Sequence, residues 1–342
     1  MAFSFRAVLV DYDEPPPDWV EGELADRGIE WVARQHRTPE AALELSRIAD
    51  VVMIQSVRPL LNQAVIQGLE RCRGIVRLGT GYDSVDLASA TKLGIPVCNV
   101  PAYCTDDVAD HALALLMDLA KHVTWHHCSI RSGNWSGTGL PTRYRIKGST
   151  LGLIGFGRIG RALAKRVSGF GMTAITYDPY VDADTISRYG VKKVSLDELL
   201  MRADFISLHP PLTDETYHML STSEFNSMKE GVYIVNTSRG PVIDEAALIE
   251  ALGAGKVAGA GLDVFEEEPP PLDSPLREFD TVILTPHIAF SSAESRIDLY
   301  RDACELAVNI VQGIWPETVV NPEVEGKTAY PFQRRDLNSR SV

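Results

Sequence analysis

The glycine-rich segment 151–160, near the middle of the chain, constrains the fold more than any other part of the sequence. It reads Leu-Gly-Leu-Ile-Gly-Phe-Gly-Arg-Ile-Gly, so an apolar run leads into Gly155, Gly157 and Gly160. In this spacing the first glycine permits a tight strand-to-helix turn, the second lets the backbone approach a pyrophosphate, and the third lets the helix pack close to the strand. We therefore expect a strand, a turn and a helix whose first amides are available to phosphate groups.

Glycine turns of this kind are followed, about 20 residues later, by an acidic residue that binds the ribose. This chain has an acidic residue at that distance. Asp178 follows the apolar stretch 174–177, eighteen residues after Gly160. A carboxylate there would bind the adenosine ribose and repel a 2′-phosphate, and the next basic residue is Arg188, ten positions further on. A glycine turn without a ligand and an ordinary turn aspartate are the alternatives. The combination favours NAD (NADH) as the cofactor and disfavours NADP.

Apolar runs alternate with amphipathic stretches over most of the 342 residues, a length that predicts two domains rather than one core. In the first hundred residues we expect helices at 19–26 and 39–48 and strands at 7–10, 51–54, 75–78 and 96–100. A second series of expected strands lies at 150–154, 174–177, 205–208, 233–236, 258–264 and 281–285. Such alternation predicts parallel sheets covered by helices, and six strands suit a doubly wound dinucleotide fold.

The order of these segments predicts a discontinuous domain. The first sheet ends near Val100, a helix follows at 106–121 with Thr105 as its N-cap, and a last helix at 294–311 returns to the first domain. The expected class is therefore α/β, with two Rossmann-like domains of doubly wound parallel sheets and an NAD domain inserted into a flavodoxin-like substrate domain. We expect the substrate (catalytic) domain at 1–101 and 297–342 and the NAD-binding domain at 102–296.

Composition excludes several classes of function. The net charge of -13 and the lack of a long basic run argue against nucleic acid as a partner. The five cysteines form no C-x-x-C pair, and His126-His127-Cys128 lacks the spacing of a metal site, so we expect a reducing cytoplasm and no metal. The start lacks the pattern of a signal peptide, and no apolar run approaches the roughly 20 residues of a membrane span.

Polar residues follow three of the later expected strands. They belong to the segments 236–240 (Asn-Thr-Ser-Arg-Gly), 262–269 (Leu-Asp-Val-Phe-Glu-Glu-Glu-Pro) and 285–289 (Thr-Pro-His-Ile-Ala). Ligands of open α/β sheets bind beyond the carboxyl ends of the strands. An arginine, an acid and a histidine could therefore converge on one site.

With these motifs the chain resembles the D-isomer-specific 2-hydroxyacid dehydrogenases from about residue 50 to about residue 320. The segments 75–86 (Ile-Val-Arg-Leu-Gly-Thr-Gly-Tyr-Asp-Ser-Val-Asp) and 94–101 (Gly-Ile-Pro-Val-Cys-Asn-Val-Pro) are most similar to the C-terminal-binding-protein branch of that family. This branch includes transcriptional corepressors that kept a dehydrogenase fold.

The resemblance implies a catalytic role for three residues. Arg239 would hold the substrate carboxylate and polarise the keto oxygen, which suits the fixed charge and forked shape of a guanidinium. His287 would give a proton to the carbonyl oxygen and take it back in oxidation. Glu268, which precedes Pro269 as in the family motif, would orient the ring of His287 and favour its protonated form. A surface salt bridge and a core histidine are the alternatives for Arg239 and His287, and we expect Glu266 and Glu267 to be solvated loop acids.

The resemblance also implies contacts around this centre. Arg77, Leu78 and Gly79 would grip the substrate carboxylate, although Arg77 could instead form a structural ion pair. Phe290 would wall the substrate pocket and favour an apolar or aromatic side chain, or would pack in the core. His209 would wall the adenine rather than act as an acid or base. The other implied cofactor contacts are Thr105, Arg158, Ile159, Pro210, Thr216, Thr237, Ser238 and Asp263.

We therefore predict an NAD-dependent D-2-hydroxyacid dehydrogenase, or 2-ketoacid reductase, with hydride transfer in an interdomain cleft. A non-catalytic NAD(H)-responsive scaffold that binds other proteins is the alternative, motivated by the corepressor-like resemblance. A formate-dehydrogenase-like activity is a weaker option, because that relative has an amide where this chain has Glu268. The polar segment 131–147 could be a mobile loop or part of an arm, residues 125–147, that packs on the second subunit of a homodimer.

Overall fold

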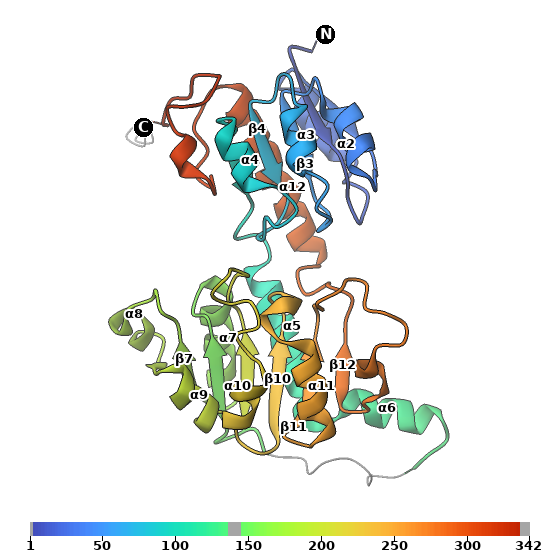
Figure 1. Cartoon of the computed structure of the whole chain (residues 1–342), viewed down its shortest axis with the longest axis vertical. Coiled ribbons are helices and arrows are strands. Elements are labelled where there is room, and N and C mark those ends of the chain that lie inside the picture. Colours follow the sequence, from blue (N-terminus) through green and yellow to red (C-terminus); the bar gives the residue numbers. More distant parts are fainter. Residues whose placement is uncertain (1–2, 136–144, 336–342) are drawn as a thin grey trace. The chain divides into compact units, whose positions relative to one another are not determined.

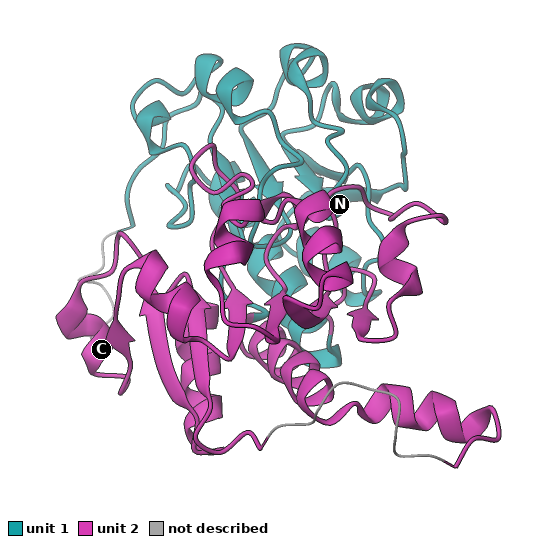
Figure 2. Ribbon diagram, turned by 60° about the horizontal axis from the view of Figure 1, so that its bottom comes forward, with its two compact units in different colours: residues 1–104, 292–342 teal, residues 105–291 magenta. Residues whose placement is uncertain are grey.

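The computed structural model describes residues 3–135 and 145–335 and divides the chain into two compact units (Figure 1, Figure 2). The split unit comprises Met1–Cys104 and Ser292–Val342, and the inserted unit is Thr105–Ser291. The sequence suggested these boundaries at 101/102 and 296/297. The middle of the proposed dimer arm, residues 136–144, lies outside the described residues.

The split unit contains a five-stranded parallel sheet in the order β2-β1-β3-β4-β5, which is the flavodoxin-like order. Its strands are β1 (Phe5–Leu9), β2 (Ile29–Ala33), β3 (Val51–Ile54), β4 (Gly74–Arg77) and β5 (Val97–Asn99). Its helices are α1 (Trp19–Ala25), α2 (Pro39–Ser46), α3 (Gln63–Gln67), α4 (Leu87–Lys92) and α12 (Ala293–Val311), with a short 3-10 turn, η3 (Pro322–Val324). Helices α1 and α12 pack in the core on one face of the sheet, and α2, α3 and α4 pack on the other.

The inserted unit contains a seven-stranded parallel sheet in the order β12-β11-β10-β9-β6-β7-β8. Counted from β6, the first six strands have the 3-2-1-4-5-6 order of dinucleotide-binding folds, with β12 as an added edge. The strands are β6 (Thr150–Ile154), β7 (Thr173–Tyr177), β8 (Lys192–Lys193), β9 (Phe205–Leu208), β10 (Val232–Asn236), β11 (Val257–Leu262) and β12 (Val282–Leu284). The predicted class, two Rossmann-like units with doubly wound parallel sheets, is confirmed.

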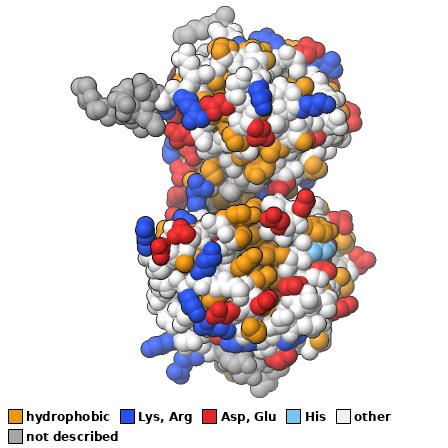
Figure 3. Space-filling view, turned by 60° about the vertical axis from the view of Figure 1, so that its left-hand side comes forward, with side chains coloured by type: hydrophobic (Ala, Val, Ile, Leu, Met, Phe, Trp, Pro, Cys, Tyr) orange, Lys and Arg blue, Asp and Glu red, His pale blue; other side chains and the backbone are white. Residues whose placement is uncertain are grey.

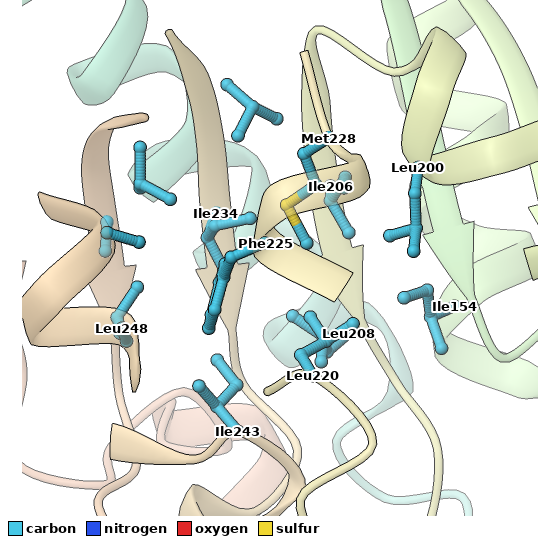
Figure 4. Packing of buried hydrophobic residues seen from close by; sticks show 14 of the residues in the cluster. Ile154, Leu200, Ile206, Leu208, Leu220, Phe225, Met228, Ile234, Ile243 and Leu248 are labelled. Atoms are coloured by element: carbon cyan, nitrogen blue, oxygen red, sulfur yellow. The ribbon is translucent and has the colours of Figure 1, made fainter. Parts of the chain in front are cut away.

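Helices cover both faces of this second sheet (Figure 1). They are α5 (Thr105–Lys121), α6 (Val123–Arg131), α7 (Arg158–Ser168), α8 (Ala183–Ser187), α9 (Leu196–Arg202), α10 (Thr222–Ser227) and α11 (Glu245–Gly253), with 3-10 turns η1 (Gly240–Val242) and η2 (Pro275–Glu278). On one face, Phe225 and Met228 pack with Ile206, Ile234 and Leu248 (Figure 4). On the other face, α5 and α7 pack against β6, β9 and β10.

Two strands were missed in the sequence, one in each sheet: the first sheet has five strands where four were predicted, and the second has seven where six were predicted. Strand β8 has two residues, both lysines, and pairs only with β7. Strand β2 lies at the edge of the first sheet and includes Glu30, whose carboxylate lies 3.7 Å from the guanidinium of Arg6 on β1. Edge strands keep one side exposed, so their polar residues break the continuous apolar run that marks a central parallel strand.

The surface combines mixed charge with one exposed helix. On the face drawn in Figure 3, acidic and basic side chains are interspersed. Helix α6 buries no residue, and Val123, Ile130 and the nearby Trp135 have exposed fractions of 62%, 50% and 92%. Figure 2 shows α6 extending away from the sheet of the inserted unit.

Within residues 3–135 and 145–335, none of the helices combines the length and the apolar character needed to cross a bilayer.

Candidate active site

The glycine turn after β6 leaves open space beside one of its three glycines and none beside the other two. Gly155 has a φ of +91°, and a Cβ there would lie 2.9 Å from the His209 backbone. A Cβ on Gly160 would lie 2.4 Å from the Gly155 carbonyl oxygen, whereas a Cβ on Gly157 would meet no atom within 4 Å. Gly157 also precedes the first residue of α7, whose early amides have no partner within the helix. The turn therefore fits a dinucleotide, which would approach at Gly157.

Asp178 ties the end of β7 to this turn. The side chain is buried, its Oδ2 accepts a hydrogen bond from the Phe156 amide at 2.7 Å, and its Oδ1 accepts from the amides of Tyr180 and Val181 at 2.8 and 2.9 Å. A carboxylate has about four acceptor positions, so one remains for a ribose hydroxyl. Arg158 is exposed and Ile159 is half-buried at the start of α7.

Two buried polar atoms near the carboxyl ends of β9 and β10 have no hydrogen-bond partner in the described structure: Nδ1 of His209 and Oγ1 of Thr237. The other ring nitrogen of His209 lies 3.0 Å from the Ser207 hydroxyl. Burial of the ring lowers the pKa of His209 to about 4, so the ring is neutral near pH 7. Neutrality agrees with a wall of a binding site and not with a general acid.

Other predicted cofactor contacts lie at the same edge of the sheet or in the loops that follow it. Pro210 is buried after β9, and the Thr216 hydroxyl donates to the Pro211 carbonyl oxygen at 2.6 Å. The Ser238 hydroxyl donates to Oδ1 of Asn236 at 2.8 Å. Thr105 is the first residue of α5 rather than the residue before the helix.

Asn236 positions Arg239. Asn236 is the last residue of β10, its Oδ1 accepts a hydrogen bond from the Ser238 amide at 3.0 Å, and its Nδ2 donates to the Arg239 carbonyl oxygen at 2.9 Å. The next residue, Gly240, cannot be replaced without movement, because a Cβ there would lie 1.9 Å from the backbone of Phe265. The turn that carries Arg239 (residues 236–240, here called the arginine turn) and the loop after β11 (residues 263–268, here called the acidic loop) are therefore in direct backbone contact.

Glu268 and His287 form the pair that the motifs predicted. Nδ1 of His287 lies 2.7 Å from Oε2 of Glu268, and Oε1 of Glu268 accepts a hydrogen bond from the Phe265 amide at 3.1 Å. Burial opposes the ionisation of Glu268, but the contact with His287, the Phe265 amide and the charge of Arg239 outweigh it and lower the pKa of the carboxyl. The charge of Arg239 thus acts on the same pair.

Asp263 holds the turn that carries His287. Its carboxylate is buried and accepts hydrogen bonds from the Thr285 hydroxyl at 2.6 Å and from the amides of Ile288 and Ala289 at 3.0 and 2.9 Å, while the His287 amide donates to the Asp263 carbonyl oxygen at 2.8 Å. His287 has a φ of +53°, an uncommon value for a residue other than glycine. These bonds stabilise that conformation.

The sequence did not indicate this supporting role of Asp263, nor the roles of Asn236 and His111. His111 on α5 lies 3.0 Å from the Thr285 hydroxyl through Nε2. A histidine within a helix and an asparagine at a strand end are common without such a role. The segments 236–240 and 262–269 placed Asn236 and Asp263 at the carboxyl edge of the sheet, but not the hydrogen bonds that these side chains make.

The predicted substrate contacts lie in both units. In the inserted unit, the ring of Phe290 is 6.5 Å from that of His287 at an interplanar angle of 73°. In the split unit, Arg77 ends β4 with a buried side chain whose Nη1 donates to the Leu78 carbonyl oxygen. Gly79 has a φ of +144°, and a Cβ there would collide with the Arg77 guanidinium.

Glu266 and Glu267 were expected to be solvated loop acids, and of the two only Glu266 has further hydrogen-bond or ion-pair contacts among the described residues. Both residues are exposed, but Oε1 of Glu266 accepts a hydrogen bond from the Glu245 amide at 3.1 Å and lies 2.7 Å from Nε2 of His218. In the described part of the chain, His218, Asp244 and Glu266 are the one group of potential metal ligands, with ligand atoms within 4.8 Å of one another.

Comparison with known proteins identifies the family. The model of the D-isomer specific 2-hydroxyacid dehydrogenase NAD-binding domain matches residues 113–289. The chain belongs to this family. Its members are dehydrogenases of 2-hydroxy acids, and the chain is accordingly an NAD-dependent oxidoreductase that interconverts 2-hydroxy and 2-keto acids.

Relatives of this family member cover most of its length. A glyoxylate reductase of Korarchaeum cryptofilum is 37% identical over 321 residues, which is 90% of this chain and 97% of that protein. A D-3-phosphoglycerate dehydrogenase of Archaeoglobus fulgidus is 40% identical over 310 residues, 88% of this chain but 59% of the longer relative. The crystal structure of a D-lactate dehydrogenase from Aquifex aeolicus, complexed with NAD and lactic acid, is 29% identical with a TM-score of 0.80 and covers 94% of this chain and 98% of that one.

Proposed function

We propose that this dehydrogenase reduces a 2-keto acid to the D-2-hydroxy acid, and catalyses the reverse reaction, with His287 as the acid and base, Glu268 as its partner and Arg239 as the anchor of the substrate carboxylate. The observation that carries this proposal is the 2.7 Å contact between His287 and Glu268, beside the charge of Arg239. The three residues follow strands of one parallel sheet at its carboxyl edge, where open α/β sheets bind ligands.

Each side chain has a defined chemical task. The guanidinium of Arg239 can bind two oxygens of a 2-keto acid and stays charged at any working pH. Because Nδ1 of His287 is bound to Glu268, Nε2 is the nitrogen that gives a proton to the carbonyl oxygen during reduction and removes it during oxidation. The carboxylate of Glu268 stabilises the imidazolium form and fixes the ring orientation. Bound NADH supplies the hydride that the carbonyl carbon receives.

The inserted unit would hold the cofactor through the glycine turn and Asp178. The open space at Gly157 supports a pyrophosphate there, and the remaining acceptor position of Asp178 supports a ribose hydroxyl. A second phosphate on that ribose would face a carboxylate held by three amides, so we propose NAD over NADP. Thr105, Arg158, Ile159, His209, Pro210, Thr216, Thr237, Ser238 and Asp263 remain predicted contacts.

The substrate is proposed to be a small 2-keto or 2-hydroxy acid with an apolar or aromatic side chain. The support is the ring of Phe290, which stands edge-on to the ring of His287. Arg77, Leu78 and Gly79 are proposed to grip the substrate carboxylate as well, and the φ of +144° at Gly79, which residues with a side chain rarely adopt, supports a specific conformation of that loop.

We further propose a cytoplasmic homodimer. The exposed apolar residues on and after α6 support a subunit contact there, and light scattering that gives the 37.6 kDa mass of one chain would refute it. The alternative, an NAD(H)-responsive scaffold of the C-terminal-binding-protein type, has less support, because Arg239, Glu268 and His287 are all present and Glu268 contacts His287 as catalysis requires.

The test is oxidation of NADH against a panel of 2-keto acids that ranges from glyoxylate and pyruvate to phenylpyruvate, with NADPH in parallel. We expect turnover with NADH, a preference for the larger side chains, and loss of that preference in F290A. Chiral analysis of the product should give the D-isomer. Tight NADH binding without turnover of any acid would reverse the ranking in favour of the scaffold, and Asp178→Ser should narrow the gap between NADH and NADPH.

A further inference from the structure

His218 lies between the two segments that carry the proposed catalytic residues. Its backbone amide donates a hydrogen bond to the Pro241 carbonyl oxygen at 2.8 Å, two residues after Arg239. Its ring nitrogen Nε2 is 2.7 Å from Oε1 of Glu266, two residues before Glu268. One residue from the loop after β9 thus contacts the loops after β10 and β11 through different atoms.

Glu266 connects the ring of His218 to the position of Glu268. Its carboxylate accepts a hydrogen bond from the Glu245 amide at 3.1 Å, and its own amide donates to Oε2 of Glu245 at 3.3 Å. The neighbouring Phe265 supplies the amide that binds Oε1 of Glu268. A shift of Glu266 would therefore move the amide that fixes the carboxylate beside His287.

The surroundings of Glu266 are rich in negative charge. Burial, together with the carboxylates of Glu266 and Glu267, raises the pKa of Glu245. Asp244 is the N-cap of α11, and its Oδ2 lies 3.9 Å from Nδ1 of His218. The ring of His218 lies against both carboxylates, 3.9 Å from Asp244 through Nδ1 and 2.7 Å from Glu266 through Nε2.

The orientation of the ring indicates a bridge between carboxylates rather than a metal ligand. Nδ1 lies nearest to Asp244, at 3.9 Å, and Nε2 lies nearest to Glu266, at an ion-pair distance of 2.7 Å without the alignment of a hydrogen bond, so the two carboxylates approach different ring nitrogens. A metal would bind one nitrogen and gather both carboxylates on that side. The ring is also stacked on Tyr217, with centroids 4.0 Å apart and 13° between the planes, and the φ of His218 is +50°.

We propose that His218 is a positioning residue of the reaction, which acts through Glu266 to hold Glu268 against His287. This proposal rests on the roles proposed above for Glu268 and His287. The backbone amide of His218 supports the arginine turn, whereas only its ring acts on the acidic loop. The two contributions can therefore be separated by a side-chain substitution.

His218→Asn is the decisive variant. Asparagine accepts a positive φ readily but is too short to reach Glu266, so the backbone contact with Pro241 is kept and the ring contact is lost. We expect kcat for keto-acid reduction to fall on the order of tenfold, because small displacements of catalytic groups reduce rate strongly. We expect KM for the keto acid to stay within about twofold, because Arg239 is not disturbed. His218→Gln, whose amide can reach Glu266, should restore most of kcat.

Two further measurements separate positioning from a merely structural role. In H218N the acid-requiring limb of the pH profile of kcat/KM should move to lower pH, because a less closely held Glu268 stabilises the imidazolium of His287 less. Combining H218N with E266Q should add little to the loss of kcat seen in either variant, since both act through one contact. Thermal unfolding of all variants shows whether the fold is intact.

An unchanged kcat in H218N would overturn the proposal. An equal loss of kcat in H218N and H218Q would overturn it as well. So would a loss of kcat that comes with a lower unfolding temperature and no movement of the pH profile. H287A and E268Q are assayed alongside. If those two variants keep full activity, the proposed function itself fails, whereas a large loss in them with normal activity in H218N rejects only the positioning role.

Discussion

Glu268 is bound by His287 at one carboxylate oxygen and by its own turn at the other: Oε2 lies 2.7 Å from Nδ1 of His287, and Oε1 accepts from the Phe265 amide. Neither oxygen can turn away without losing a charged or hydrogen-bonded contact. The carboxylate is therefore fixed in orientation, as the proton transfer proposed for His287 would require.

Replacing the carboxylate of Glu268 by the amide of glutamine removes the negative charge and keeps the shape of the side chain. In E268Q we expect kcat for keto-acid reduction to fall on the order of 100-fold, because the imidazolium loses its counter-charge and the ring its fixed orientation. The dissociation constant of NADH, measured by fluorescence, should change little. A variant with wild-type kcat at every pH from 5 to 9 would contradict the role given to Glu268.

The lowered pKa of Glu268 also predicts how stability depends on pH. The folded-state pKa lies below the ordinary value, so the unfolded state binds the proton first as the pH falls. The contribution of Glu268 is complete above its unfolded pKa and is lost as the pH falls through the folded pKa. The difference in free energy of unfolding between wild type and E268Q should therefore shrink on acidification from pH 6 to pH 3, as urea titrations can measure.

Arg239 offers a test of substrate binding apart from proton transfer. R239K keeps the charge but loses the fork that binds two oxygens, and the loss of one charge-assisted hydrogen bond costs about 1.5–3 kcal/mol. We expect KM for the keto acid to rise roughly 10- to 100-fold, with NADH affinity unchanged. Steady-state kinetics over a wide range of keto-acid concentration checks this, and an unaltered KM would place the substrate carboxylate elsewhere.

Much of this site could be predicted from the sequence, for identifiable reasons. Central parallel strands are continuous apolar runs, and polar residues follow them, so the sequence places an arginine, an acid and a histidine at one edge of the sheet. The choice of Glu268 among three consecutive acids came from the family resemblance. The contact of Glu266 with His218 could not be predicted, because it joins residues 48 positions apart through a left-handed turn that local sequence does not encode. Asp263 was predicted as a cofactor contact, yet its hydrogen bonds support the turn of His287, a role visible only in three dimensions.

The glycine turn provides a matched pair of variants for the cofactor site. A methyl group at position 157 meets no protein atom, whereas one at position 160 lies 2.4 Å from the Gly155 carbonyl oxygen. G157A should therefore unfold at the wild-type temperature but bind NADH about tenfold more weakly or worse, since the methyl group would occupy the proposed approach of the pyrophosphate. G160A should be destabilised by about 1–3 kcal/mol through overpacking, even without NADH. Equal thermal stability of the two variants would contradict this account of the turn.

His209 predicts a loss of stability in mild acid that one substitution should remove. Its folded-state pKa is about 4 and its ordinary value is 6.5, because the ring is buried although part of the residue is exposed. Below pH 6.5 the His209 ring binds a proton in the unfolded state but not in the folded state. The free energy of unfolding therefore falls as the pH is lowered from 6.5 to about 4. The full effect is on the order of 3 kcal/mol. H209Q, which keeps an amide near Ser207 but cannot titrate, should show a flatter dependence of unfolding free energy on pH over this range. If the unfolding free energy of wild type and H209Q had the same dependence on pH, the ring would be solvated and not buried as proposed.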